Sequence, residues 1–236
     1  MRIAGSGRLT GGKIDDELHI SGSVRITEDF ECNGFSSSGS TRINGDLTIH
    51  GDIRNSGSFR HHGSLYVEGD AKFSGSTSVD GEILVERDLA NSGSFRAGNK
   101  ITVHGDINFS GSTRVQGAII SRKDIIISGS GTIHGNITGV DILIGRERLF
   151  KRSIYKHPNK IYGDIISRKD LKLIGTLVDG DVRGYEVVIG PGTEILGTVY
   201  YISDIQVHDK AILANDPVKV NIENIEKNKD KFKNYQ

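Results

Sequence analysis

The sequence reads SGSTRINGDLTIHGDIRN at 38–55, SGSFRHHGSLYVEGDAKF at 56–73, SGSTSVDGEILVERDLAN at 74–91 and SGSFRAGNKITVHGDINF at 92–109. Each of these blocks has eighteen residues and begins with Ser-Gly-Ser, and most positions six residues apart hold glycine. The second and fourth residues after these positions are mostly apolar. Alternation with a period of two is typical of strands, and glycine is typical of turns. Each block therefore predicts three short strands joined by three corners.

Three short strands per repeat, each with one apolar face, close most simply into a triangular β-solenoid. We name the side that begins at Ser-Gly-Ser side A, and the next two sides B and C. The pattern starts near Gly5 with two turns of seventeen residues, continues in turns of eighteen from Gly39, and ends near Ala214. The prediction is one all-β domain over 1–214, with about eleven turns of 17–18 residues. At the usual strand spacing of about 4.8 Å the rod is on the order of 50 Å long.

One turn is longer than the others. After Arg146, side A extends over 147–162 before the repeat resumes. The pentapeptide ISRKD occurs at 120–124 and again at 166–170, on the same corner of the repeat. A basic loop of ten extra residues is therefore inserted into an otherwise intact solenoid. The lysine-rich tail, 215–236, is expected either to cap the last turn or to extend away from it.

The composition favours a protein of the cytoplasm. The chain has 30 basic and 30 acidic residues, and one cysteine, Cys32, at an inward position where it is expected to be a small core residue. No apolar run is long enough for a secretion signal or for the roughly 18 residues of a membrane span. We expect no metal, nucleotide or other cofactor and no specific nucleic-acid partner.

The core has a finer pattern at the corner between sides C and A. Each turn places one phenylalanine there beside a smaller inward residue, and the side that supplies it alternates. Large beside small fills an interior without voids. The pairs are Asn55 with Phe59, Phe73 with Thr77, Asn91 with Phe95, and Phe109 with Thr113.

Ser-Gly-Ser followed by a β-branched or aromatic residue, Gly-Asp at the corners, and IGPGTEILG at 189–197 resemble the bactofilins, which are polymer-forming cytoskeletal proteins. The resemblance covers roughly residues 3–213. It implies a right-handed β-helix that assembles end to end, without nucleotide, into unpolarised filaments of itself or with a paralogue. It also implies a scaffold for envelope, motility or morphogenesis components. The chain is longer than the usual member and lacks the proline-rich tails that many members carry.

Two alternatives remain open. A hexapeptide-repeat acyltransferase also has six-residue sides, in a left-handed solenoid with a catalytic histidine, but there an aliphatic residue directly precedes the glycine. That phase fits only locally here, at Ile189-Gly190. His50 and His104 share a column three turns apart, and we interpret them as solvated corner residues. The second alternative is a monomeric solenoid that binds an anionic surface.

A solenoid exposes strand edges and core at its terminal turns, which predicts a polymer interface at each end. Charged substitutions at Leu18 and Ile20 are expected to stop elongation without unfolding the protein. The residues predicted at the amino-terminal end are Ile3, Leu9, Ile14, Leu18 and Ile20. Those predicted at the carboxy-terminal end are Ile205, Val207, Ile212 and Leu213.

Side A places arginine at its central outward position in turn after turn. We weigh two interpretations: a solubilising coat, and a basic face for an anionic partner such as the inner face of the cell membrane. Apolar residues among the charges of the loop favour the membrane. The basic face comprises Arg8, Arg25, Arg42, Arg60, Arg96, Arg114, Arg148, Lys151, Arg152 and Lys156.

Two further columns point outward. Aspartates at the start of side C either cap turn amides or, less favourably, form a calcium ladder; they are Asp52, Asp70, Asp88, Asp106, Asp124 and Asp170. Side B carries an apolar stripe that reflects strand propensity or a lateral contact. The stripe consists of Tyr66, Leu84, Ile120, Ile166 and Tyr200.

Overall fold

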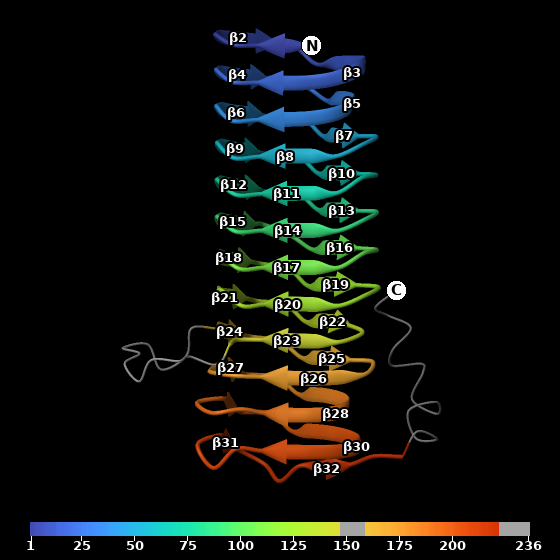
Figure 1. Ribbon diagram of the computed structural model, residues 1–236, viewed down its shortest axis with the longest axis vertical. Coiled ribbons are helices and arrows are strands. Elements are labelled where there is room, and N and C mark those ends of the chain that lie inside the picture. Colours follow the sequence, from blue (N-terminus) through green and yellow to red (C-terminus); the bar gives the residue numbers. More distant parts are fainter. Residues whose placement is uncertain (147–158, 222–236) are drawn as a thin grey trace.

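A computed structural model describes residues 1–146 and 159–221, and Figure 1 shows them as one rod of stacked turns. These residues form strands and no helix, and neighbouring strands are parallel. In Figure 1 the nearer strands run from right to left and the fainter ones behind them from left to right while the chain descends, so the coil is right-handed. The predicted all-β solenoid of about 11 turns is confirmed.

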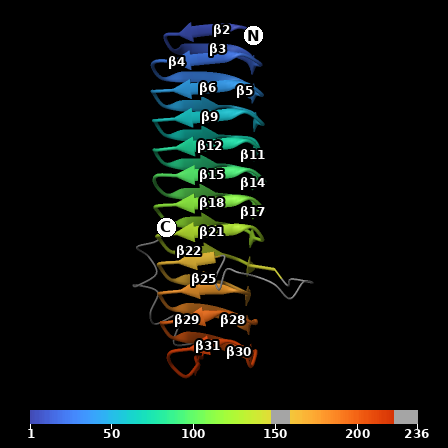
Figure 2. The same ribbon diagram turned by 90° about the vertical axis from the view of Figure 1, so that its left-hand side faces the viewer.

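Side A is a twelve-stranded sheet of its own. Figure 2 shows its strands stacked in one straight column. Its strands are β2 (Ser6–Leu9), β4 (Ser23–Ile26), β6 (Ser40–Ile43), β9 (Ser58–His61), β12 (Ser76–Val79), β15 (Ser94–Ala97), β18 (Ser112–Val115), β21 (Ser130–Ile133), β24 (Asn159–Ile161), β27 (Thr176–Val178), β29 (Glu194–Ile195) and β31 (Ile212–Leu213).

Sides B and C form one twenty-stranded sheet, because four strands near the ends of the rod run through the corner between them. These four are β3 (Gly12–Ile20), β5 (Phe30–Ser37), β28 (Val182–Ile189) and β30 (Val199–Val207). Side B also has β7 (Leu47–Ile49), β10 (Leu65–Val67), β13 (Ile83–Val85), β16 (Ile101–Val103), β19 (Ile119–Ser121), β22 (Ile137–Gly139), β25 (Ile165–Ser167) and β32 (Val218–Lys219). Side C also has β1 (Arg2–Ile3), β8 (Ile53–Asn55), β11 (Ala71–Phe73), β14 (Leu89–Asn91), β17 (Ile107–Phe109), β20 (Ile125–Ile127), β23 (Ile142–Ile144) and β26 (Asp170–Leu173).

The strand register has one longer step at the position of the inserted loop. Thr113 pairs with Gly131, which is the regular step of eighteen residues, whereas Gly131 pairs with Asn159. That second step is ten residues longer, as the sequence predicts. Ile120 and Ile166 both pair with Thr138, so the register on side B is the same before and after the insertion. The loop residues 147–158 lie outside the described part of the chain.

The predicted corner of large and small residues lies in the core. All eight residues of the four predicted pairs are at most 3% exposed. Their phenylalanines, with Phe35 in the turn before them, form a continuous ladder of rings whose successive centroids lie 5.7, 6.3, 5.5 and 5.5 Å apart. Such contacts add to the hydrophobic gain of burying each ring. Sides A and C supply the phenylalanine in alternate turns, and this alternation keeps the rings in contact without crowding any one turn.

The repeated glycines serve a different purpose from the one that the sequence suggests. Gly57 and Gly93 at the Ser-Gly-Ser corner do not have positive φ, and among the described glycines only Gly11, Gly12, Gly145, Gly175 and Gly192 do. A Cβ on Gly57 would overlap the carbonyl oxygen of Gly39 in the preceding turn. Glycine is therefore required at this corner because successive turns approach each other so closely.

Candidate interaction surfaces

The amino-terminal end of the rod consists of β1, β2 and the first part of β3. Ile3, Leu9 and Ile14 are half-buried there and pack against the core. Among the described residues, β2 pairs only with β4, so its outer edge is open. These three residues lie where the sequence predicts an interface.

The prediction is wrong for Leu18 and Ile20, which are 0% and 2% exposed. The chain begins with β1, which pairs with the second half of β3 so that Ile3 lies on Ile20. The Met1 ammonium group holds this strand down by donating to the Glu17 carbonyl oxygen at 2.6 Å and to the Asp16 carboxylate at 2.9 Å. Charged residues at these two positions would therefore disrupt the core and would not test an interface.

The carboxy-terminal end exposes more apolar surface. Val207 is 44% exposed and Ile212 is 53% exposed, while Ile205 and Leu213 are half-buried. All four lie where the sequence predicts an interface. Leu196 (46%) and Val218 (42%) are also exposed near this end, and neither was predicted from the sequence.

Strand pairing continues past the predicted boundary at residue 214. Val218 and Lys219 of β32 pair with Tyr200 and Tyr201 of β30, and the Val220 amide donates to the Tyr201 carbonyl oxygen. The first residues of the predicted tail therefore extend side B. Residues 222–236 lie outside the described part of the chain.

Side A carries the predicted arginine column. The register places Arg8, Arg25, Arg42, Arg60, Ser78, Arg96 and Arg114 on successive strands. All six arginines are exposed. Within residues 1–146 and 159–221, none of their guanidinium groups has a hydrogen bond or an ion pair. The other predicted members of the basic face, Arg148, Lys151, Arg152 and Lys156, lie outside the described residues.

A column of exposed serines runs beside the arginines, two positions earlier on each strand. We call the outward surface of the side A strands from β2 to β21 the Ser–Arg face. These side A strands contain no acidic residue. Where Ser78 replaces arginine, the face has a groove of about 260 Å³ between Arg60, Arg96 and Arg114. The serines are Ser6, Ser23, Ser40, Ser58, Ser76, Ser94, Ser112 and Ser130.

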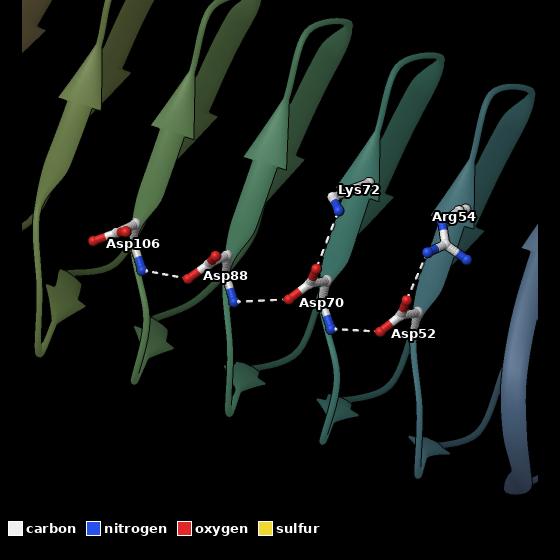
Figure 3. A network of polar contacts seen from close by, with 6 residues as sticks. All are labelled: Asp52, Arg54, Asp70, Lys72, Asp88 and Asp106. Atoms are coloured by element: carbon white, nitrogen blue, oxygen red, sulfur yellow. Dashed lines mark hydrogen bonds and ion pairs between the residues drawn. The ribbon is translucent and has the colours of Figure 1, made fainter.

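The aspartate column caps backbone amides, as the favoured interpretation predicts. Asp52 Oδ1 accepts the Asp70 amide at 2.9 Å, and Asp88 Oδ1 accepts the Asp106 amide at 2.9 Å. Figure 3 shows this ladder, in which each carboxylate reaches the backbone of the next turn. It continues through Asp124 and Asp141 to the Asp170 amide. The Asp141 step was missed because the sequence there departs from the glycine period.

Basic side chains neutralise part of this ladder. Arg54 donates to the second oxygen of Asp52 at 2.6 Å, and Lys72 donates to Asp70 at 3.1 Å. The hydrogen bond from Lys72 is the main reason that the pKa of Asp70 lies below its usual value. The carboxylates therefore have local partners, unlike the guanidinium groups of the Ser–Arg face.

Two histidines on side B contact glutamates. His50 contacts Glu31 at 2.7 Å and Glu68 at 2.9 Å, and these contacts raise the pKa of its imidazole, with Glu31 contributing most. His104 contacts Glu86 at 2.5 Å. These side chains lie on the outside of the rod, where charge-assisted contacts to carboxylates hold them.

His61 is a buried histidine that the sequence analysis did not single out. It is 0% exposed and occupies the inward column of side A between Ile43 and Val79. Its Nε2 contacts the Ser64 carbonyl oxygen at 2.9 Å, and its Nδ1 has no partner among the described residues. Burial lowers the pKa of its imidazole. A polar residue in an otherwise apolar column was the only sequence signal for it.

Other predicted features are placed as follows. Cys32 is buried, and burial raises the pKa of its thiol to about 11. The five residues of the side B stripe are half-buried. In the described part of the chain, no cluster of three or more histidine, cysteine or acidic residues is arranged to hold a metal ion. No helix in the same residues could span a membrane.

Comparison of the chain with protein-family models, with curated proteins and with solved structures finds no match.

Proposed function

We propose that this protein is a non-enzymatic cytoskeletal scaffold that assembles end to end into filaments without nucleotide. It would do so in the cytoplasm, with further copies of itself or with a paralogue, and would organise components of the envelope, of motility or of morphogenesis. The observation that carries the proposal is the pair of rod ends, each of which has apolar residues beside a strand edge with no partner among residues 1–146 and 159–221. Such edges pair readily with another chain unless they are covered.

The two ends match in chemistry. Leu9 begins and Leu213 ends the same inward column of side A, so a second copy placed on the rod axis would continue that column with leucine against leucine. Ile3 and Val207 likewise begin and end an inward column of side C. Stacking along the axis would bury these side chains and satisfy the strand edges together, which is how neighbouring repeats of a solenoid stabilise one another.

The resemblance to the bactofilins supports the same function, since that family polymerises through its β-helix. The acyltransferase alternative has less support, because His50 and His104 are engaged by glutamates on the outside of the rod. A monomeric solenoid remains the simpler competing function, and polymerisation separates it from the proposal.

The test uses exposed residues, so that the variants fold. Ile212→Glu places a charge at the carboxy-terminal end, where the side chain is 53% exposed. Ile126→Glu is the matched control, since Ile126 is 38% exposed in the middle of side C. Sedimentation should show that the first variant loses elongation and that the second elongates like the wild type. Equal polymerisation of Ile212→Glu and wild type would remove the carboxy-terminal end from the assembly.

Cysteine cross-linking reports the polarity of the filament. Arg8 and Ile212 begin and end one outward column, so head-to-tail stacking would place their Cα atoms about one strand spacing, ~4.8 Å, apart, within disulfide range. The double variant Arg8→Cys with Ile212→Cys should then form covalent ladders. Cross-linking of either single variant to itself would indicate that like ends meet, as in the unpolarised filaments that the resemblance implies.

A further inference from the structure

The Ser–Arg face has the properties of a surface that is built for a partner. Its six guanidinium groups are exposed, lie on successive strands apart from the break at Ser78, and have no partner among the described residues. Neighbouring arginines are about 4.8 Å apart along the column, so their like charges repel. An anionic partner would remove this repulsion.

Basic residues on side C show that the chain can neutralise its own cations. Arg54 and Lys72 are also exposed on an outward column, but each donates to an aspartate of the adjacent ladder. Acidic residues at the corner after side A are engaged elsewhere: Asp46 accepts the Ser64 amide at 2.7 Å, and Asp80 contacts His62 at 2.6 Å. No acidic residue in the described part of the chain therefore pairs with the arginines of the Ser–Arg face, which leaves them for an external anion.

The shape of the face indicates which kind of partner fits. Figures 1 and 2 show the strands of side A in one straight stack, so the outward positions of these strands lie along one side of the rod. A planar partner can reach all six arginines at once. The outward residues of β2 to β21 are serine, arginine and threonine, without an exposed apolar side chain, so the contact would be with headgroups and not with acyl chains.

We infer that the Ser–Arg face docks the rod on a membrane that carries anionic lipid headgroups. The cytoplasmic leaflet is negatively charged, and basic residues near its surface are attracted to it. The groove at Ser78 receives one headgroup phosphate, with guanidinium groups of Arg60, Arg96 and Arg114 around it and serine hydroxyls beside them. Guanidinium groups bind phosphate through two parallel hydrogen bonds. The inference does not rest on the filament proposal, because a single chain carries the whole face.

The test measures whether the full chain floats with vesicles in a density gradient. Flotation is chosen because filaments sediment on their own, so sedimentation could not separate bound from unbound protein. Vesicles of phosphatidylcholine with phosphatidylserine should carry the protein upward at low salt, and vesicles of phosphatidylcholine alone should not. Binding should weaken as salt rises, since exposed charges are screened. The triple variant Arg60→Ser, Arg96→Ser and Arg114→Ser repeats the residue already present at Ser78. Each arginine is expected to contribute a factor of roughly five to the affinity for anionic vesicles, so the triple variant should bind them about a hundredfold more weakly than the wild type.

The matched control removes three cations from side C. Arg54→Ser, Lys72→Ser and Lys172→Ser lie on one outward column that already holds Ser36. This variant has the same net charge as the triple variant of the Ser–Arg face and should float like the wild type. The inference is overturned if the wild type ignores anionic vesicles at low salt, or if both triple variants lose binding equally. It is also overturned if the protein binds a soluble polyanion such as heparin through this face but does not bind anionic vesicles.

Discussion

Two columns of charge run along the same rod, and they differ in how their charges are satisfied. The aspartates at the start of side C accept amides of the next turn, and two of them also contact Arg54 or Lys72. The arginines of the Ser–Arg face have no such partners in the described part of the chain. A charged column can therefore be a structural part of a solenoid or a surface that is free to bind, and the contacts distinguish the two although the sequence periodicity is the same.

The largest effect on stability should come from breaking the aspartate ladder. Asp52→Ala removes the acceptor of the Asp70 amide and the partner of Arg54, and should lower the free energy of unfolding by about 1–2 kcal/mol. Asp52→Asn keeps Oδ1 as an acceptor and should restore most of the loss. Urea denaturation measures both. If both variants lowered the free energy of unfolding equally, the charge of Asp52 and not its amide cap would stabilise this corner.

The second effect on stability is expected from His61, which is buried on the inner face of side A beside the exposed Arg60. Because burial lowers the pKa of His61 in the folded protein, the unfolded chain takes up the proton first as the pH falls. Stability should be full above the unfolded pKa of about 6.5 and should decrease as the pH falls through the folded pKa. Thermal melts between neutral and acid pH measure this decrease.

A matched pair of variants assigns that pH dependence. His61→Val copies Val79 of the same column and should reduce the loss of stability below neutral pH. His62→Val changes the neighbouring exposed histidine, and this variant should still lose stability below neutral pH. An unchanged pH profile in His61→Val would mean that other groups dominate acid unfolding.

The smallest effect on stability is expected for the arginine column. Arg96→Ser should leave the free energy of unfolding unchanged within the error of urea denaturation, because the guanidinium group has no partner among the described residues. A clear loss of stability would show that the arginines support the fold, as the aspartates do, and would end the distinction between the two columns.

Much of the fold could be predicted from the sequence because the solenoid repeats one local rule. The Ser-Gly-Ser corners fix the start of each side A, and the alternation after them fixes which residues point inward. The ten-residue insertion followed for the same reason, since the repeat of ISRKD preserved the register across it. The amide caps of the aspartates were also predicted, because a short acidic side chain at a corner reaches nearby backbone donors.

The remaining features depend on contacts that periodicity does not encode. Leu18 and Ile20 are covered because the short strand β1 precedes the first full turn and pairs with β3. Successive turns approach too closely for a Cβ at Gly57, which is a property of the stack and not of the local backbone. Whether a charged column is paired depends on neighbouring columns, as Arg54, which pairs with Asp52, and Arg60, which has no partner among the described residues, show.

End-to-end assembly can be tested by electron microscopy of the purified protein without nucleotide. We expect long filaments one rod wide, with the strand spacing of about 4.8 Å repeating along the filament axis because the strands lie across the rod. Single rods that stay separate at every protein concentration would contradict it.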